Sequence, residues 1–307
     1  MKKYINPGHE RKSLTLIDNI IYSNQTDLNS KPMELKMSIL FQNGNSEMKL
    51  AAGEDDPKEN HDTKPALLWI PGGGWRGVDK NLMLGEMSQF ADAGYVVASM
   101  YYRSSGEAHF PAQIIDVKTA IRFLRANAIK YEIDPDRIGV FGRSAGGHLA
   151  AFAAMNTDTF ESEEWSGYSS KANACCNMFG PTDVVALMNE EEKSFNNPNS
   201  RWHRIEDTHG GKLIGGDPST IKERAKSASP VNYVNPDMCP MLILHGDNDP
   251  LVPLELSSDV LYSRIKEAGM EDRTDYYVLE GAGHGSREFF QDSVKQLMIS
   301  FFDKYLK

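Results

Sequence analysis

A serine between two glycines is the first feature of the sequence that could carry chemistry. Gly142-Arg143-Ser144-Ala145-Gly146 fits the pattern G-x-S-x-G, follows an apolar stretch at 138–141 and precedes a run of small residues at 145–155. A sharp turn from strand to helix, called a nucleophile elbow, needs glycine at both ends because a side chain would collide with the neighbouring backbone. We predict that Ser144 is an exposed nucleophile and that the Ala145 N–H can stabilise a negative oxygen. The alternative is an ordinary serine in a glycine-rich turn.

A second glycine-rich segment lies upstream. Pro71-Gly72-Gly73-Gly74-Trp75 directly follows the apolar stretch at 67–70. Glycines let backbone N–H groups approach a substrate oxygen without obstruction by side chains. A nucleophile elbow takes the second half of its oxyanion hole from such a loop. We assign the N–H groups of Gly73 and Gly74 to this role, in addition to that of Ala145. A phosphate-binding loop is less favoured, because no G-K-[ST] follows.

A serine nucleophile needs a base that removes its proton and a carboxylate that orients the base. His284 lies in the sequence GAGHG, after an apolar stretch at 276–279. Asp249 lies in HGDNDPLVP, after an apolar stretch at 241–244. The chain order serine, acid, histidine accompanies this kind of elbow. We therefore predict that His284 is the base and Asp249 the acid, with Asp247 as the competing candidate for the acid.

The remaining histidines are interpreted as structural or exposed. His148 is four residues after Ser144, one turn down the predicted helix, so its side chain should point into the packing and away from the serine. His245 is expected to cap the end of a strand. His203 and His209 belong to an irregular polar segment, where exposure to solvent is favoured over a place in the pocket.

The elements that must position these residues alternate along the chain. Short apolar runs predict strands at 35–41, 67–70, 95–100, 137–141, 175–179, 241–244 and 276–279. Helical spacing predicts helices at 81–93, 114–124 and 145–155. Such alternation indicates βαβ units and a mostly parallel sheet with helices on both faces. The candidate residues then follow the carboxyl ends of strands, where ligand sites of such sheets form.

Two segments interrupt this alternation. Residues 51–64 are rich in Gly, Asp, Glu and Lys, and are interpreted as an exposed loop between two strands. Residues 189–216 are polar, without a clear period, and too long for an ordinary connection. Long loops of this kind often cover active sites. We therefore expect one domain over residues 1–307, with residues 189–216 as an excursion over the site.

The composition narrows the range of partners. The 307 residues carry a formal net charge of −10, which disfavours nucleic acid as a partner. The three cysteines form no CxxC pair, so neither a metal site nor a disulfide framework is predicted. No apolar run is long enough for a membrane span or for the core of a signal peptide, and we expect a cytoplasmic protein. The oligomeric state stays open, a homo-oligomer included.

Taken together, the motifs resemble those of a known family. The sequence is similar to the hormone-sensitive-lipase-like carboxylesterases of the α/β-hydrolase fold, which include acetyl esterases, acetylxylan esterases and feruloyl esterases. The resemblance covers roughly residues 65 to 305 and rests on these segments: PGGGW at 71–75, FPAQ at 110–113, DPDRIGV at 134–140, GRSAGGHLA at 142–150, FGPTD at 179–183, ASP at 228–230, HGDNDPLVP at 245–253 and GAGHG at 281–285.

The resemblance implies an α/β-hydrolase sheet, no cofactor, and a triad of Ser144, Asp249 and His284. It also implies short-chain or aromatic acyl esters as substrates. Two positions depart from the commoner pattern: Pro71 stands in place of histidine, and Arg143 in place of an acidic residue. Arg143 puts a permanent charge beside the nucleophile and leaves the preferred substrate open.

The substrate pocket is the least defined part of these expectations. Trp75, Arg143 and Trp202 are expected to line it, and the two tryptophans should favour acyl groups of about two to four carbons. The competing functions are a peptidase or amidase that uses the same triad, and a catalytically inactive homologue that only binds its ligand.

Overall fold

An eight-stranded sheet organises the part of the chain that the computed structural model describes, which is residues 2–6, 12–43, 63–77 and 79–307. The strand order is β1-β2-β4-β3-β5-β6-β7-β8. β1 pairs with β2, and β2 with β4, in antiparallel fashion, whereas all later pairs are parallel. This mostly parallel sheet confirms the predicted fold class. The loop expected at 51–64 lies, up to residue 62, outside the described residues.

The strands and helices that the sequence predicts are present at the expected positions to within a few residues, and β1 and α5 to α9 are additional. The strands are β1 (Ser13–Thr26), β2 (Pro32–Asn43), β3 (Lys64–Ile70), β4 (Val96–Met100), β5 (Ile133–Arg143), β6 (Ala174–Met178), β7 (Met241–Gly246) and β8 (Thr274–Leu279). The α-helices are α2 (Leu84–Asp92), α3 (Ala112–Ala126), α4 (Ala145–Ala154), α5 (Val184–Glu192), α6 (His209–Ile214), α7 (Ile221–Ala225), α8 (Ser258–Glu267) and α9 (Asp292–Leu306).

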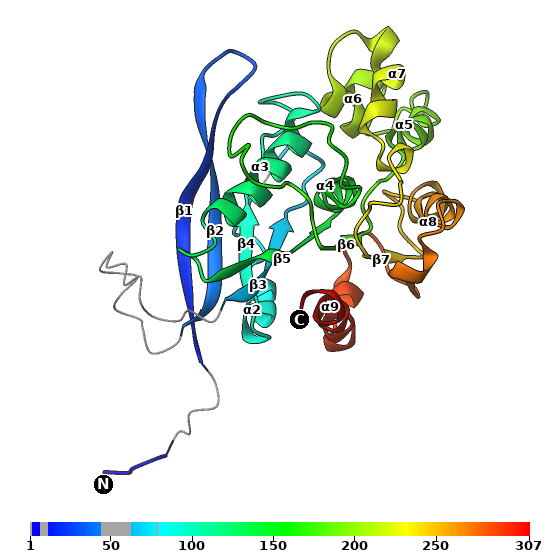
Figure 1. Cartoon of the computed structure of the whole chain (residues 1–307). Coiled ribbons are helices and arrows are strands. Elements are labelled where there is room, and N and C mark those ends of the chain that lie inside the picture. The colour runs from blue at the N-terminus through cyan, green and yellow to red at the C-terminus, as the bar shows by residue number, and fades with distance from the viewer. Residues whose placement is uncertain (1, 7–11, 44–62, 78) are drawn as a thin grey trace.

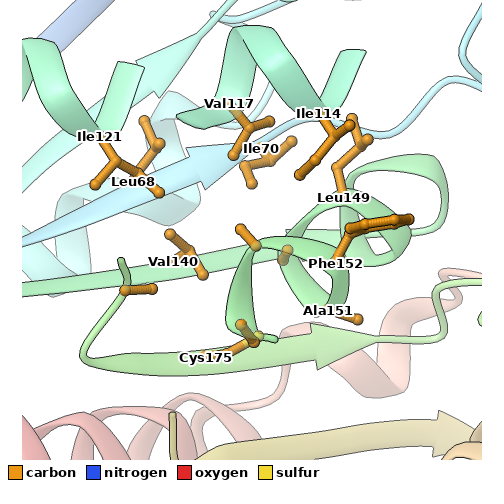
Figure 2. Packing of buried hydrophobic residues seen from close by; sticks show 14 of the residues in the cluster. Leu68, Ile70, Ile114, Val117, Ile121, Val140, Leu149, Ala151, Phe152 and Cys175 are labelled. Carbon is orange, nitrogen blue, oxygen red and sulfur yellow. The ribbon is translucent and has the colours of Figure 1, made fainter. Parts of the chain in front are cut away.

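Two apolar layers cover the two faces of the sheet. Alternate residues of β3 point in opposite directions, so Leu68 and Ile70 join one core cluster while Leu67 and Trp69 join the other. The first cluster holds the apolar faces of α3, α4 and α8, and the second those of α2 and α9. Figure 2 shows the first layer, in which side chains of α3 and α4 pack directly onto the sheet. These layers fix the strand ends that carry the site.

Some elements carry no clear signal in the sequence. β1 lies at the edge of the sheet, and its register against β2 shifts between Ile17 and Ile20 and again between Ile21 and Ser23. Each shift breaks the alternation of apolar and polar residues by which a strand is recognised. Residues 189–216, expected to be irregular, contain the end of α5 and the short helix α6. These helices lie beside α7 above the carboxyl ends of the strands (Figure 1).

None of the helices in the described ranges combines the length and the apolarity that crossing a bilayer requires.

Candidate active site

Ser144 sits in a strained turn between β5 and α4. Its φ of 52° and ψ of −124° are unusual for a residue with a side chain. A Cβ on Gly142 would lie 2.4 Å from the carbonyl oxygen of Gly146, and a Cβ on Gly146 would lie 1.9 Å from that of Ile70. Only glycine fits at both positions, as the G-x-S-x-G pattern predicts. The tight turn holds the serine hydroxyl at the edge of the sheet.

The structure brings the three predicted residues into one hydrogen-bonded chain. His284 follows β8, and its Nε2 lies 2.8 Å from the Ser144 Oγ. Its Nδ1 lies 2.7 Å from Oδ2 of Asp249, which follows β7. A histidine with its proton on Nδ1 donates to Asp249 and accepts the proton of the Ser144 hydroxyl. This is the geometry that general-base activation of a serine requires.

Asp249 is a buried carboxylate held in its ionised form. Burial by itself raises the pKa of this carboxyl, but hydrogen bonds from His245, His284 and the Val252 N–H outweigh the effect and hold the pKa well below its ordinary range. Its Oδ1 accepts from the N–H groups of Leu251 and Val252, both at 2.9 Å. An anion so fixed can orient the imidazole of His284 and stabilise its protonated form.

Asp247, the competing candidate for the acid, makes different contacts from those of Asp249. It is exposed, and its Oδ1 accepts the N–H of Gly281 at 2.7 Å. The contact ties the loop after β7 to the loop after β8, and His284 donates to Asp249 rather than to Asp247.

His245, expected to cap a strand, lies near the end of β7. Its Nε2 is 3.4 Å from Oδ2 of Asp249.

The predicted oxyanion loop lies beside the serine. Gly73 has a φ of 133° and Gly74 a φ of 60°, both in the range that favours glycine. A Cβ on Gly73 would lie 1.8 Å from the Gly77 carbonyl oxygen. The N–H of Ala145, in the first position of α4, has no acceptor within the helix. Gly73, Gly74 and Ala145 line one cleft with Ser144 and His284, so their N–H groups can reach an oxygen bound there.

Trp75 and His148 form a support beneath the oxyanion loop. The indole Nε1–H of Trp75 donates to Nδ1 of His148 at 3.2 Å, and His148 Nε2 donates to the Ala228 carbonyl at 2.7 Å. His148 therefore points into the packing behind α4, as predicted. Trp75 lines the cleft as expected, but it is only 1% exposed. Little of the indole is therefore available to contact a substrate.

A cleft of about 720 Å³ opens above the serine. Arg143 and Trp202 line it, as predicted, and residues 189–216 supply much of its outer wall. The expectation for His209 was wrong: it lines the cleft, with its ring edge-on to Trp202 at 5.0 Å between centroids. A Cβ on Gly74 would lie 2.6 Å from the His209 ring, so the glycine loop permits this close approach. His203 is exposed, as expected.

Sequence reasoning did not identify several other residues of the cleft as part of the site. Phe179 packs the edge of its ring against His284, with centroids 4.8 Å apart, and limits the movement of the imidazole. Glu190, Glu191 and Arg201 line the outer part of the cleft. Only the segment FGPTD around Phe179 stands in a recognisable motif. The others come from a segment without periodicity, so only the folded chain reveals their place.

Comparisons with known proteins agree with this geometry. Residues 56–264 match the BD-FAE family. Esterase LipC of Mycobacterium tuberculosis is 31% identical over 228 residues, which are 73% of this chain and 54% of LipC. This chain thus spans about half the length of such curated relatives.

Solved structures extend the similarity over nearly the whole fold. A truncated carbohydrate esterase from gut microbiota superposes with a TM-score of 0.76 at 29% identity, covering 97% of this chain and 98% of the other. A bifunctional GH43-CE protein of Bacteroides eggerthii gives a TM-score of 0.74 at 25% identity, covering 95% of this chain and 35% of the other. With its parallel sheet, its elbow serine and a family match over more than half of its residues, the chain belongs to the BD-FAE family of α/β hydrolases.

Proposed function

We propose that this protein is a serine carboxylesterase in which Ser144, His284 and Asp249 form the catalytic triad. The observation that carries the proposal is the continuous hydrogen-bonded chain from the serine hydroxyl through the imidazole to a buried carboxylate. The similarity to LipC and to a carbohydrate esterase supports ester hydrolysis over other uses of the fold.

The reaction follows from the positions of the side chains. His284 Nε2 takes the proton of Ser144 as the Oγ attacks the ester carbonyl, and Asp249 stabilises the imidazolium that forms. The carbonyl oxygen becomes negative and accepts hydrogen bonds from the N–H groups of Gly73, Gly74 and Ala145. His284 then gives its proton to the leaving alcohol, which leaves an acyl group on Ser144. A water molecule, activated by the same imidazole, releases the acid in a second round.

The cleft supports a small acyl group. Its outer wall carries Glu190, Glu191, Arg201 and His209, and the solvation of such groups is costly to remove. A long alkyl chain laid along them would bury polar groups without giving them partners. We therefore propose acetyl-like short acyl groups as the acids of the natural esters. Hydroxycinnamoyl groups, which the family resemblance implies, are the alternative.

Labelling of the serine tests the proposed function. A fluorophosphonate probe should modify the wild-type protein at Ser144, and p-nitrophenyl acetate should be hydrolysed. Ser144→Ala should abolish both, with a loss of about six orders of magnitude in kcat, as in a related serine hydrolase. Ser227→Ala is the matched control, because Ser227 is an exposed serine whose hydroxyl only donates to the Arg224 carbonyl. Labelling that persists in the Ser144 variant, or turnover near the wild-type rate, would refute the assignment.

A panel of substrates separates the esterase from its competitors. Hydrolysis of esters with little turnover of the matching anilides is expected for an esterase, and the reverse preference indicates an amidase or peptidase. Labelling without turnover of any ester, anilide or peptide would instead indicate a binding protein.

A further inference from the structure

Arg143 is a cation placed directly beside the nucleophile. It ends β5, lines the same cleft as Ser144 and His284, and is partly buried there. Its Cγ and the Cβ of Ser144 each lie 3.4 Å from the point at which Gly72 would carry a Cβ. The two side chains therefore pack next to each other against a glycine. Arg143 also lines a second, mostly apolar cavity with Met87, Phe90 and Phe289. A ligand group that reaches the guanidinium from the cleft would lie close to an ester held at Ser144.

The guanidinium has no partner within the described part of the chain. Arg143 makes no side-chain hydrogen bond, ion pair or ring contact there, whereas the buried Arg103 and the partly buried Arg122 do. Arg103 pairs with Asp116 at 2.7 Å and Arg122 with Glu161 at 2.6 Å. Burial lowers the pKa of the Arg143 guanidinium, and no neighbouring carboxylate opposes this effect. A cation withdrawn from water without a counter-ion is costly unless a ligand supplies the counter-ion.

Further cations lie beside the outer cleft, around the Trp202 that lines it. Around the ring of Trp202 lie Arg201 at 4.7 Å, Arg76 at 5.5 Å and Lys212 at 6.0 Å from the centroid. None of these three cations has a carboxylate partner among the described residues. The same wall also carries two acidic residues. Glu190 pairs with Lys193 at 2.5 Å, whereas Glu191 lies 3.7 Å from His209 and its buried Oε2 has no hydrogen-bond partner among the described residues.

This distribution is unexpected for a chain with a net charge of −10. Arg143 and Arg201 line the cleft without acidic partners among the described residues, although Glu190 and Glu191 line it as well. An unpaired guanidinium beside the serine attracts an anion and orients it as it enters.

We propose that Arg143 binds a carboxylate carried by the ester substrate itself, on either the acyl or the alcohol half. A guanidinium matches a carboxylate through two parallel N–H···O bonds, which fix orientation as well as affinity. Arg143 is thus a specificity-determining residue of the proposed esterase, and the cations around Trp202 guide the anion into the cleft. The inference rests on the proposed function of the site.

Pairs of esters that differ in one charge test the proposal. On the acyl side, the 4-nitrophenyl ester of succinate is compared with the 4-nitrophenyl ester of monomethyl succinate. On the alcohol side, 4-acetoxybenzoate is compared with methyl 4-acetoxybenzoate. The readout is the ratio of kcat/KM for the anionic ester to that for its neutral partner. The neutral ester therefore serves as the internal reference for each variant.

The wild type should favour the anionic member of at least one pair, and Arg143→Met should lower that ratio by ~10-fold or more, chiefly through KM. Arg143→Lys should keep part of the preference, because lysine retains the positive charge but cannot make the two parallel N–H···O bonds of the guanidinium. Arg143→Gln gives a second neutral variant if the Met variant does not fold. Arg264→Met is the control, since Arg264 is exposed, pairs with Glu267 and does not line the cleft, so the ratio should be unchanged.

Either of two results would overturn the inference. In the first, the wild type hydrolyses the anionic and the neutral ester of each pair with the same kcat/KM. In the second, the ratio of the two kcat/KM values is unchanged in the Arg143 variants. Failure of the proposed function is recognised separately. In that case the neutral esters are not hydrolysed either, and Ser144 is not labelled by the fluorophosphonate.

Discussion

At the scale of single residues, the site was predictable wherever a local motif determines the backbone. Ser144 and His284 are 140 positions apart, yet each stands in a glycine-rich turn that follows a strand of the parallel sheet. Such turns need glycine because a larger side chain would collide with the backbone, and the glycines can be read directly from the sequence. Phe179 and Arg201 could not be placed in this way, because their role depends on contacts between distant segments.

The choice between two aspartates is a prediction at this scale. Asp249→Asn should lower kcat by about four orders of magnitude, because the amide favours the wrong tautomer of His284. Asp247→Asn should change kcat only a few-fold, because the asparagine carbonyl can still accept the N–H of Gly281. Steady-state kinetics of both variants on one ester, with circular dichroism to check folding, make the comparison. A larger loss in the Asp247 variant would move the acid to that residue.

At the scale of elements, apolar patterning predicted the central strands well and the edge of the sheet poorly. β3, β4 and β6 are buried along nearly their whole length, so that continuous apolar runs mark them. β1 is mostly exposed and carries two register shifts. The short helix α6 begins at a Thr208 cap that accepts the Gly211 N–H. With six residues, α6 is too short to show a helical period.

α4 carries a buried histidine that makes the stability of the protein depend on pH. His148 is fully buried between Trp75 and the Ala228 carbonyl, and burial lowers its pKa from 6.5 to about 4, although the hydrogen bond to Ala228 opposes the shift. The unfolded chain therefore binds a proton more readily than the native protein. The stability that neutral His148 contributes is complete above pH 6.5 and is lost as the pH falls towards 4.

Replacement of His148 by glutamine tests this linkage. Glutamine can still accept the Trp75 N–H and donate to the Ala228 carbonyl, but it does not titrate. Between pH 7 and pH 4, the free energy of unfolding of the wild type should fall by about 3 kcal/mol more than that of His148→Gln. Urea denaturation at a series of pH values measures the difference. If the free energies of unfolding of the two proteins fall in parallel as the pH is lowered, His148 is not the cause of the loss of stability in acid.

At the scale of the whole molecule, the topology of the sheet brings the chemistry together. β3, β5, β7 and β8 run parallel, so the residues that follow them meet at one edge. The glycine loop, the serine, the acid and the histidine follow these four strands. The segment 189–216 then closes the cleft from outside with its own aromatic and charged residues. The motifs could thus be placed in advance, whereas the outer wall of the cleft could not.

The polar character of that wall leads to the last prediction, which concerns the length of the acyl chain. Where an alkyl chain longer than a few carbons lies against Glu190, Glu191 or Arg201, it displaces water from charged groups. The kcat/KM for p-nitrophenyl esters should therefore be highest at about two to four carbons and fall by up to ~10-fold for each methylene beyond that range. Trp202→Ala should widen the outer cleft and flatten the decline. A maximum at octanoate or longer chains in the wild type would mean that the wall accepts lipid-like chains, contrary to the charges that line it.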